Sequence, residues 1–314
     1  MTSKNFISFI KILGVFFLIS IMMDRMVYWS LNSFSDKVYS GQGIGKLNHY
    51  FKIKDSLDLI VFGSSRANRH FVINELSNNG FNIGVDGRKI AYPATLVELL
   101  PEKKKQTVIF NVDISYMIDS TYQGEDVDAL MTYYDRNKIV KNNIDRLGYN
   151  NPFQKVYSTI SYNGYVVSIL YNFLFPKYDY KKYDGYDPNF INPEQQEKLK
   201  KTILSEKPSD CPKRLTINAV TREDLARIAK FCNENNKRLI FVSSPIYKDA
   251  CKTDNVLIAK FMKENGYTYY DYTDFFTKNN SLTFWKDMQH MSDKGAHLFS
   301  RKLAQDLNLN VEVK

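Results

Sequence analysis

The sequence predicts an α/β fold: a three-layer α/β/α arrangement in which helices cover both faces of a parallel sheet, carried by one transmembrane helix at the N-terminus. Short apolar segments typical of buried strands alternate with segments of helical periodicity from residue 57 onward. Strands that alternate with helices form parallel sheets with helices on both faces. An apolar run of membrane-spanning length precedes them within residues 1–25.

The N-terminal apolar run is Phe6–Met23, eighteen residues interrupted only by Lys11. It is long enough to cross a bilayer as a helix, and the Tyr28-Trp29 pair beyond it fits an aromatic anchor at the membrane interface. The run lacks a small-residue cleavage site, so we expect residues 1–25 to be a retained anchor rather than a cleaved signal peptide. Basic residues on its two sides nearly balance, so charge does not fix its orientation.

After the anchor, the sequence predicts a juxtamembrane linker and then one domain. Residues 26–56 are the predicted linker, with the glycine-rich stretch 41–45 as its flexible part. Residues 57–314 are the predicted domain. Strands are expected at Asp58–Gly63, Phe81–Val85, Thr107–Asp113, Arg238–Ser243 and Tyr267–Asp271. Helices are expected at Pro93–Leu100, Arg222–Asn235, Asn255–Asn265 and Asp293–Leu307.

A tyrosine-rich insertion, residues 115–216, interrupts this alternation between the third and fourth predicted strands. It carries more than half of the 22 tyrosines. We predict that it is largely helical, over Asp135–Leu147, Pro152–Phe173 and Pro193–Leu204. Ligands of parallel sheets bind outside the carboxyl ends of the strands, so the insertion is expected beside the site. Its tyrosines form either the insertion's own core or stacking platforms for sugar rings.

The net charge of +9 and the pI near 9.1 indicate an anionic partner, such as a phospholipid surface or an acidic glycan. The sequence shows no nucleic-acid-binding motif, so we expect no nucleic acid as a partner. Its three cysteines and four histidines form no metal-binding spacing, and we expect no metal and no other cofactor. Cys211 and Cys251 lie in loop-like sequence, which leaves a disulfide between them open, whereas Cys232 is expected in the core.

The first candidate for chemistry is Ser65, within the segment Phe62–Arg66. A serine just past a buried strand, at a glycine turn into a helix, presents its hydroxyl at the edge of the sheet. The N-terminus of that helix offers N–H groups to a developing oxyanion. The alternative is that Ser64 and Ser65 only cap the helix.

The second candidate is the segment Asp-Met-Gln-His at residues 287–290, just before the last predicted helix. A serine hydroxyl needs an imidazole to accept its proton, and the imidazole needs a carboxylate to fix its tautomer. We predict that Asp287 folds back onto His290 and that His290 is the base for Ser65. The alternative is an ordinary surface loop. His70 and His297 compete for the role of the base, but one follows the serine too closely and the other falls within the last helix.

The order of these segments resembles that of the SGNH (GDSL-type) hydrolase family, which has a flavodoxin-like three-layer fold. The resemblance covers residues 58–87, 107–113 and 238–307, and it excludes the anchor and the insertion. The turn Gly-Ser-Ser-Arg and the ending Asp-Met-Gln-His-Met-Ser-Asp-Lys-Gly-Ala look like membrane-anchored members that modify the cell envelope. Those members include the D-alanine-transfer proteins of teichoic acid and the acetylation proteins of alginate.

The resemblance implies a catalytic triad and an oxyanion glycine, which correspond to Ser65 as nucleophile, His290 as base, Asp287 as its partner, and Gly87 or, failing that, Gly84. The backbone N–H of the nucleophile is implied as a second oxyanion donor. In the family, a third donor is an asparagine amide after the third strand. Asp113 occupies that place here, and an ionised carboxylate would repel an oxyanion.

Four further residues are candidates for this oxyanion or substrate site. Asn111 lies two residues before Asp113 and on the same face of the strand. Arg66 and Asn68 follow the nucleophile closely and are expected to complete the oxyanion hole, unless the hole is incomplete. Arg66 and Arg69 would also suit an anionic group of the substrate, with solvated helix charges as the alternative.

The resemblance implies acyl transfer through an acyl-serine intermediate, either hydrolysis of an ester or O-acylation of a cell-envelope or extracellular glycan. It implies a single-pass protein of the cytoplasmic membrane with its domain outside the cytoplasm. The expected partners are the bilayer, a glycan or acylated polysaccharide substrate, and a membrane-bound acyl donor protein. One alternative is a catalytically inactive SGNH-fold component for binding or assembly, which Asp113 favours. Another is a soluble cytoplasmic esterase.

Overall fold

Five parallel strands form one sheet in the computed structural model, which describes residues 3–176, 180–205, 211, 216–249 and 251–309. The strands are β1 (Leu59–Phe62), β2 (Gly80–Asn82), β3 (Gln106–Asn111), β4 (Lys237–Ser243) and β5 (Tyr269–Asp271). They lie in the order β2-β1-β3-β4-β5. This order reverses direction between β1 and β3, and a reversal opens a crevice at the carboxyl ends of those strands. The predicted α/β fold with a parallel sheet is confirmed.

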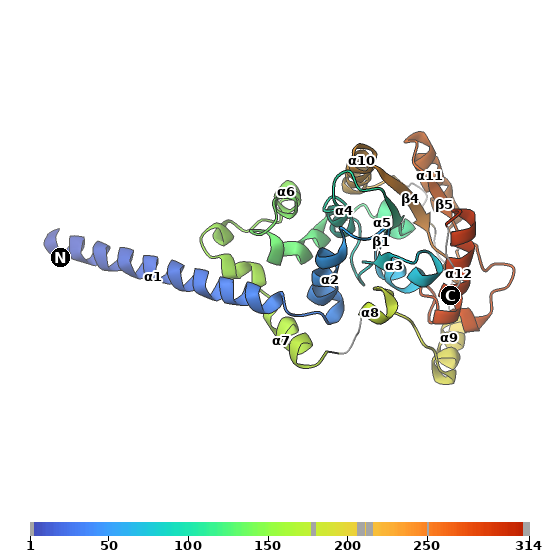
Figure 1. The fold of residues 1–314 in the computed structure, drawn as a ribbon, viewed down its shortest axis with the longest axis horizontal. Helices are drawn as coiled ribbons and strands as arrows, with labels where there is room; N and C mark the ends of the chain where they lie inside the picture. The colour runs from blue at the N-terminus through green and yellow to red at the C-terminus, as the bar shows by residue number, and fades with distance from the viewer. Residues whose placement is uncertain (1–2, 177–179, 206–210, 212–215, 250, 310–314) are drawn as a thin grey trace.

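Helices pack on both faces of the sheet (Figure 1). Successive residues of a strand point to opposite faces, and the strands β1 and β3 have buried apolar residues at successive positions, so both faces need this cover. Ile60 and Phe110 share one hydrophobic cluster with residues of α2, α4, α10 and α11. Val61 and Ile109 belong to a second cluster with residues of α3 and α12. These helices are α2 (Lys46–Ile53), α3 (Ser65–His70), α4 (Ala91–Val97), α10 (Ala219–Glu234), α11 (Lys252–Glu264) and α12 (Asp293–Asp306).

The strands and helices expected outside the insertion are present with shifted ends. The second strand, predicted to reach Val85, ends at Asn82. The side-chain oxygen of Asn82 accepts the N–H of Gly84 at 2.9 Å. The N–H groups of Ile83 and Val85 still donate to the carbonyl oxygens of Val61 and Gly63, so hydrogen bonding to β1 and its following turn continues past the end of β2. The asparagine side chain competes locally with the regular strand, and hydrophobic periodicity does not detect such competition.

The N-terminal helix α1 (Ser3–Ser35) has 33 residues, and its most apolar stretch is wholly exposed. It is the one helix among the described residues that is long and apolar enough to cross a membrane, and it fits either a single span or a signal sequence. Figure 1 shows it projecting away from the rest of the chain.

The structure differs from the predicted linker at residues 26–56. Helix α1 continues to Ser35, residues 41–45 form the π-helical turn η1 (Gly41–Gly45), and α2 places Leu47 and Tyr50 in the core. The Asn48 amide donates to the carbonyl oxygens of Ser35 and Val38, at 2.7 and 2.9 Å, and so ties the end of α1 to α2. Helix α1 is therefore joined to the domain by ordered structure instead of a flexible tether.

The insertion contains short helices separated by turns: α5 (Ile114–Ile118), η3 (Glu125–Tyr133), α6 (Lys138–Arg146), η4 (Pro152–Lys155), η5 (Ser158–Tyr162), α7 (Val166–Leu174), α8 (Tyr180–Tyr183) and α9 (Pro193–Ser205). The prediction of one helix over Pro152–Phe173 is wrong. Gly164, with a φ of +81°, interrupts it before α7. Outside the insertion, the described residues also form the short 3₁₀ turns η2 (Ile73–Glu75) and η6 (Leu282–Phe284).

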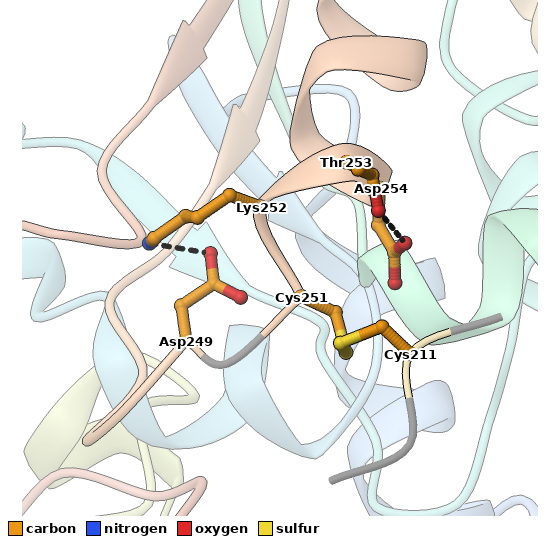
Figure 2. The surroundings of a disulfide bond; sticks show 6 residues. All are labelled: Cys211, Asp249, Cys251, Lys252, Thr253 and Asp254. Carbon is orange, nitrogen blue, oxygen red and sulfur yellow. Dashed lines mark hydrogen bonds and ion pairs between the residues drawn. A yellow bond between two sulfur atoms is a disulfide. The ribbon is translucent and has the colours of Figure 1, made fainter. Parts of the chain in front are cut away.

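A disulfide joins Cys211, at the end of the insertion, to Cys251, the residue that precedes α11 (Figure 2). The pairing that the sequence left open is thus present. In Figure 2, Lys252 beside it reaches the carboxylate of Asp249. Cys232 is a buried free thiol of α10, as expected for a core residue.

Candidate active site

The candidate site lies at the carboxyl ends of β1 and β3, where the strand order reverses. The chain leaves β1 through Gly63, whose φ is +144°, and enters α3 at Ser65. A Cβ atom on Gly63 would lie 2.9 Å from the Cβ of Ala67 and 3.0 Å from the carbonyl oxygen of Asn111. Only glycine fits this turn. Ser64 caps α3 by accepting the N–H of Arg66, so the capping expected of both serines falls to Ser64.

Ser65, His290 and Asp287 form a continuous hydrogen-bonded chain. The Ser65 Oγ lies 2.8 Å from the Nε2 of His290, although the two residues are 225 positions apart in sequence. The Nδ1 of His290 lies 2.9 and 3.0 Å from the two carboxylate oxygens of Asp287. With Nδ1–H donating to the carboxylate, Nε2 is left to accept the serine proton, which is the arrangement that a general base requires.

The carboxylate of Asp287 folds back onto its own loop, as the sequence predicted. Its Oδ1 accepts the backbone N–H groups of Gln289 and His290, at 2.9 and 2.8 Å. Burial acts to raise the pKa of Asp287, but the hydrogen bond and charge of His290 and these two N–H groups outweigh burial and lower the pKa. The carboxylate is consequently ionised at neutral pH, when it can stabilise a protonated imidazole.

The loop that carries His290 is held at both ends. Trp285 and Met291 pair as an antiparallel bridge, and both side chains are fully buried. Lys286 N–H donates to the His290 carbonyl oxygen at 2.9 Å, and Ser292 then caps α12. The imidazole is therefore presented by a closed turn on a buried base, which preorganises it toward the serine.

His70 supports this loop and does not compete for the base role. It is completely buried; its Nε2 accepts the N–H of Met291 at 3.1 Å and its Nδ1 lies 2.9 Å from Ser244 Oγ. The acceptor role of Nε2 requires the proton on Nδ1, which donates to that hydroxyl. Burial, reinforced by the charge of Arg66, lowers the pKa of His70 far below 6.5, so the ring stays neutral. His297, the other rival, pairs instead with Glu75.

Asp113 is not available as an oxyanion donor and is neutralised by a buried ion pair. Arg66 Nη1 donates to its Oδ1 at 2.7 Å, and both side chains are less than one-tenth exposed. The hydroxyl of Ser64 donates to the other carboxylate oxygen. Because the second terminal nitrogen of Arg66 donates to the Ser244 carbonyl, the arginine is committed to this network.

Most other residues expected in the oxyanion hole are also occupied. The Gly84 N–H donates to Asn82, and the amide of Asn68 donates to Asp86 and accepts from Lys46. Arg66 and Asn68 therefore do not complete the oxyanion hole as predicted. Both side chains are buried, and their polar groups form hydrogen bonds with neighbouring side chains instead. Gly87 lies on an exposed turn with a φ of +75°.

Asn111 is the exception among these residues. Its side-chain oxygen accepts the N–H of Ser244 at 3.3 Å. Its amide nitrogen is buried and has no hydrogen-bond partner within the part of the chain that the structure describes. An unsatisfied buried donor is rare in proteins, and among the predicted site residues only this amide nitrogen and the Nε of Arg66 are such side-chain donors in the described part of the chain.

Sequence reasoning missed Lys46, which it placed in the linker. Lys46 lies on α2, is fully buried, and donates to Asn68 at 2.8 Å and to the carbonyl oxygen of Gly84. It thereby joins α2 to the loop beside the serine. Burial lowers its pKa to about 7, although Asp187 and Asp86 act in the opposite direction. A lysine among glycines carries no sequence signal of such burial.

The low pKa of Lys46 predicts a pH-dependent stability. The folded protein holds fewer protons than the unfolded one between pH 7 and 10.5, the ordinary pKa of a lysine, so the free energy of unfolding rises with pH there. Relative to Lys46→Met, the wild type should gain up to about 1.4 kcal/mol per pH unit in this window. Chemical unfolding in detergent at several pH values measures this difference. Lys52→Met, an exposed change on the same helix, should show no such trend.

The last part of the insertion contacts both α3, which begins at Ser65, and the loop that carries His290. Asp187 N–H donates to the carbonyl oxygen of Asn68, and its carboxylate pairs with Arg69 at 2.9 Å. The amide of Asn189 donates to the Met291 carbonyl at 2.9 Å. Arg69 also binds Asp86, so it is part of this network and not a solvated helix charge. Tyr178, one of the insertion's tyrosines, lies outside the described residues.

Comparison with known proteins adds no relative to this description. No protein-family model matches the chain, and no curated protein matches it either. Within the described residues, no group of three or more histidine, cysteine or acidic side chains is placed to hold a metal ion.

Proposed function

We propose that this chain is a membrane-anchored serine esterase or O-acyltransferase of the SGNH type. The observation that carries the proposal is the pair of contacts at His290, 2.8 Å from Ser65 Oγ on one side and 2.9 Å from Asp287 on the other. The nucleophile Ser65 follows β1, and Asp287 and His290 lie just before α12. This order, and these positions near the two ends of the domain, resemble those of the SGNH family.

The proposed reaction forms and then cleaves an acyl-serine. His290 Nε2 takes the Ser65 proton as Oγ attacks the ester carbonyl, and the developing imidazolium is stabilised by Asp287. The tetrahedral intermediate collapses as Nε2 returns the proton to the leaving alcohol. Water or a sugar hydroxyl then enters, gives its proton to His290 Nε2 and attacks the acyl carbon. The bond from the acyl carbon to Ser65 Oγ breaks as Nε2 returns that proton to Oγ, which restores the free serine. Water makes the enzyme an esterase, and a sugar makes it a transferase.

The oxyanion would be stabilised by the backbone N–H of Ser65, with the glycine turn at Gly87 as the second element. Removing one such donor typically costs about 10²–10³ in rate. The Asp113–Arg66 ion pair replaces the family's amide with a neutralised group, so it neither donates to the oxyanion nor repels it with a full charge.

That ion pair also favours a second candidate function, a catalytically inactive SGNH-fold component for binding or assembly in envelope polysaccharide modification. In this candidate the fold and the hydrogen-bonded triad are retained, and the missing third donor abolishes turnover.

The proposed substrate is a glycan or acylated polysaccharide outside the cytoplasmic membrane, supplied with acyl groups by a membrane-bound donor protein. Three features support this setting. The helix α1 suits a membrane span, the charge of +9 suits an acidic polymer, and the Cys211–Cys251 disulfide suits an oxidising compartment.

A fluorophosphonate probe tests the proposal, because it reacts covalently with activated serines. Full-length protein in detergent micelles should be labelled, and Ser65→Ala should abolish the labelling. Ser64→Ala is the matched control and should retain it, since the Ser64 hydroxyl is buried and donates to Asp113. Circular dichroism establishes that each variant is folded. A folded wild type that remains unlabelled would contradict the esterase and support the inactive component.

A further inference from the structure

The helix α7 exposes an apolar surface that its own domain does not cover. Its nine residues, Val-Val-Ser-Ile-Leu-Tyr-Asn-Phe-Leu, include no charged side chain, and only Ile169 is buried. The exposed apolar side chains on and directly after the helix are Val167, Leu170, Tyr171, Phe173, Leu174 and Phe175. Exposed apolar patches of this kind mark interaction sites on soluble domains.

The patch adjoins the membrane-spanning helix candidate. Figure 1 shows α7 beside the end of α1, and the rings of Phe34 and Phe173 lie 4.6 Å apart. Ile169 of α7 shares a small hydrophobic cluster with Val38, against which Leu31 and Phe34 of α1 pack. The apolar surface of α7 is therefore attached to the helix that the bilayer would surround.

A second set of contacts fixes the insertion further back along α1. The Asp24 carboxylate, almost fully buried, accepts the N–H groups of Ser158 and Thr159 at 2.8 and 3.1 Å. The Tyr157 hydroxyl lies 3.0 Å from the Ser20 hydroxyl. The insertion thus reaches the apolar part of α1, and its exposed Phe153 lies four residues before Tyr157.

The length of α1 permits α7 to reach the bilayer. Exposed apolar side chains run along α1 from Phe6 to Trp29. These 24 residues extend about 36 Å at 1.5 Å per residue, against a hydrocarbon thickness of about 30 Å. A helix longer than the bilayer is thick accommodates the excess by tilting. Tilting toward α7 lowers that side of the domain onto the lipid surface.

We propose that α7 is a second membrane contact, an interfacial helix that lies in the lipid headgroup region with its apolar side chains among the acyl chains. The occupant of the exposed face is the phospholipid bilayer itself, because the face is apolar, uncharged and continuous with α1. The inference requires that α1 is retained as a span, and it does not rest on the proposed esterase activity.

Reporter cysteines in the full-length chain test this. Leu174→Cys carries an environment-sensitive fluorophore, and the protein is reconstituted in phosphatidylcholine liposomes that contain nitroxide-labelled lipid. Leu174 is 63% exposed, so the change disturbs no packing. Val15→Cys in α1 is the positive control, and Val256→Cys on α11, 69% exposed, is the matched negative control. Cys232 remains because burial raises the pKa of its thiol to about 12 and keeps it unreactive.

The label at position 174 should show blue-shifted emission and lose fluorescence to the nitroxide lipid, as the label at position 15 does, while the label at 256 should do neither. Emission at 174 that matches 256 and is quenched by aqueous iodide would overturn the proposal. A label shielded from both quenchers would overturn it as well, because a protein partner or a second copy would then cover the face. Neither outcome alters fluorophosphonate labelling of Ser65.

Discussion

His290→Ala should slow fluorophosphonate labelling of Ser65 by about 10²–10⁴-fold, the usual contribution of a positioned general base. The expectation follows from the single 2.8 Å contact between the imidazole and the serine hydroxyl. Without it, the hydroxyl has no acceptor for its proton and is a poor nucleophile at neutral pH. Rates are measured on full-length protein in micelles from the time course of labelling.

Two further variants make this measurement specific. Asp287→Asn keeps an oxygen for the N–H groups of Gln289 and His290 but removes the negative charge. It should slow labelling by less than His290→Ala, because the Asp287 side chain is half exposed and water partly replaces it. His297→Ala is the control and should leave the rate near that of the wild type, since His297 contacts Glu75. Equal labelling rates in all variants would show that His290 and Asp287 do not activate Ser65.

Arg66→Met should destabilise the fold by about 3–5 kcal/mol, the usual effect of breaking a buried ion pair from one side. It leaves the carboxylate of Asp113, 5% exposed, without its cation. Asp113→Leu should be damaging for the converse reason. The double variant should recover most of the loss, because no buried charge then lacks a partner. Chemical unfolding in detergent measures all three; additive losses would contradict the pairing.

The same pair affects any attempt to place at position 113 the amide that the SGNH resemblance implies. Asp113→Asn alone leaves the guanidinium of Arg66 buried without a carboxylate, so we expect a less stable protein and no faster labelling. When Asp113→Asn is combined with Arg66→Met, no arginine binds the new asparagine, and its amide is free to donate to the oxyanion. If Ser65 is the nucleophile, this double variant should be labelled faster than Arg66→Met alone.

The sequence predicted those parts of the site that depend on local patterns. Runs of buried β-branched and aromatic residues located the strands, and the glycine turn located Ser65 at the end of β1. The spacing from Asp287 to His290 was sufficient because the carboxylate only needs to fold back three residues. Topology then placed the two segments together, since parallel strands end at one edge of a sheet.

What the sequence did not predict depends on burial between distant segments. Lys46 and His70 look like ordinary polar residues of a linker and a short helix, yet both are completely buried. The roles of Arg66 and Asn68 were wrong for the same reason, because their buried partners belong to other loops. Periodicity describes one segment at a time and carries no information on which side chains meet across the core.

The ordered connection from α1 through η1 to α2 has a mechanical consequence. A group on a flexible linker would sample a wide range of positions relative to α1. Here the backbone passes from α1 through a short ordered turn and η1 to Lys46, which donates to the carbonyl oxygen of Gly84 in the loop beside Ser65. If α1 spans a bilayer, the Ser65 hydroxyl would lie at a nearly fixed height above the membrane surface. Under the proposed function, a polysaccharide would then react only where it approaches the membrane to that height.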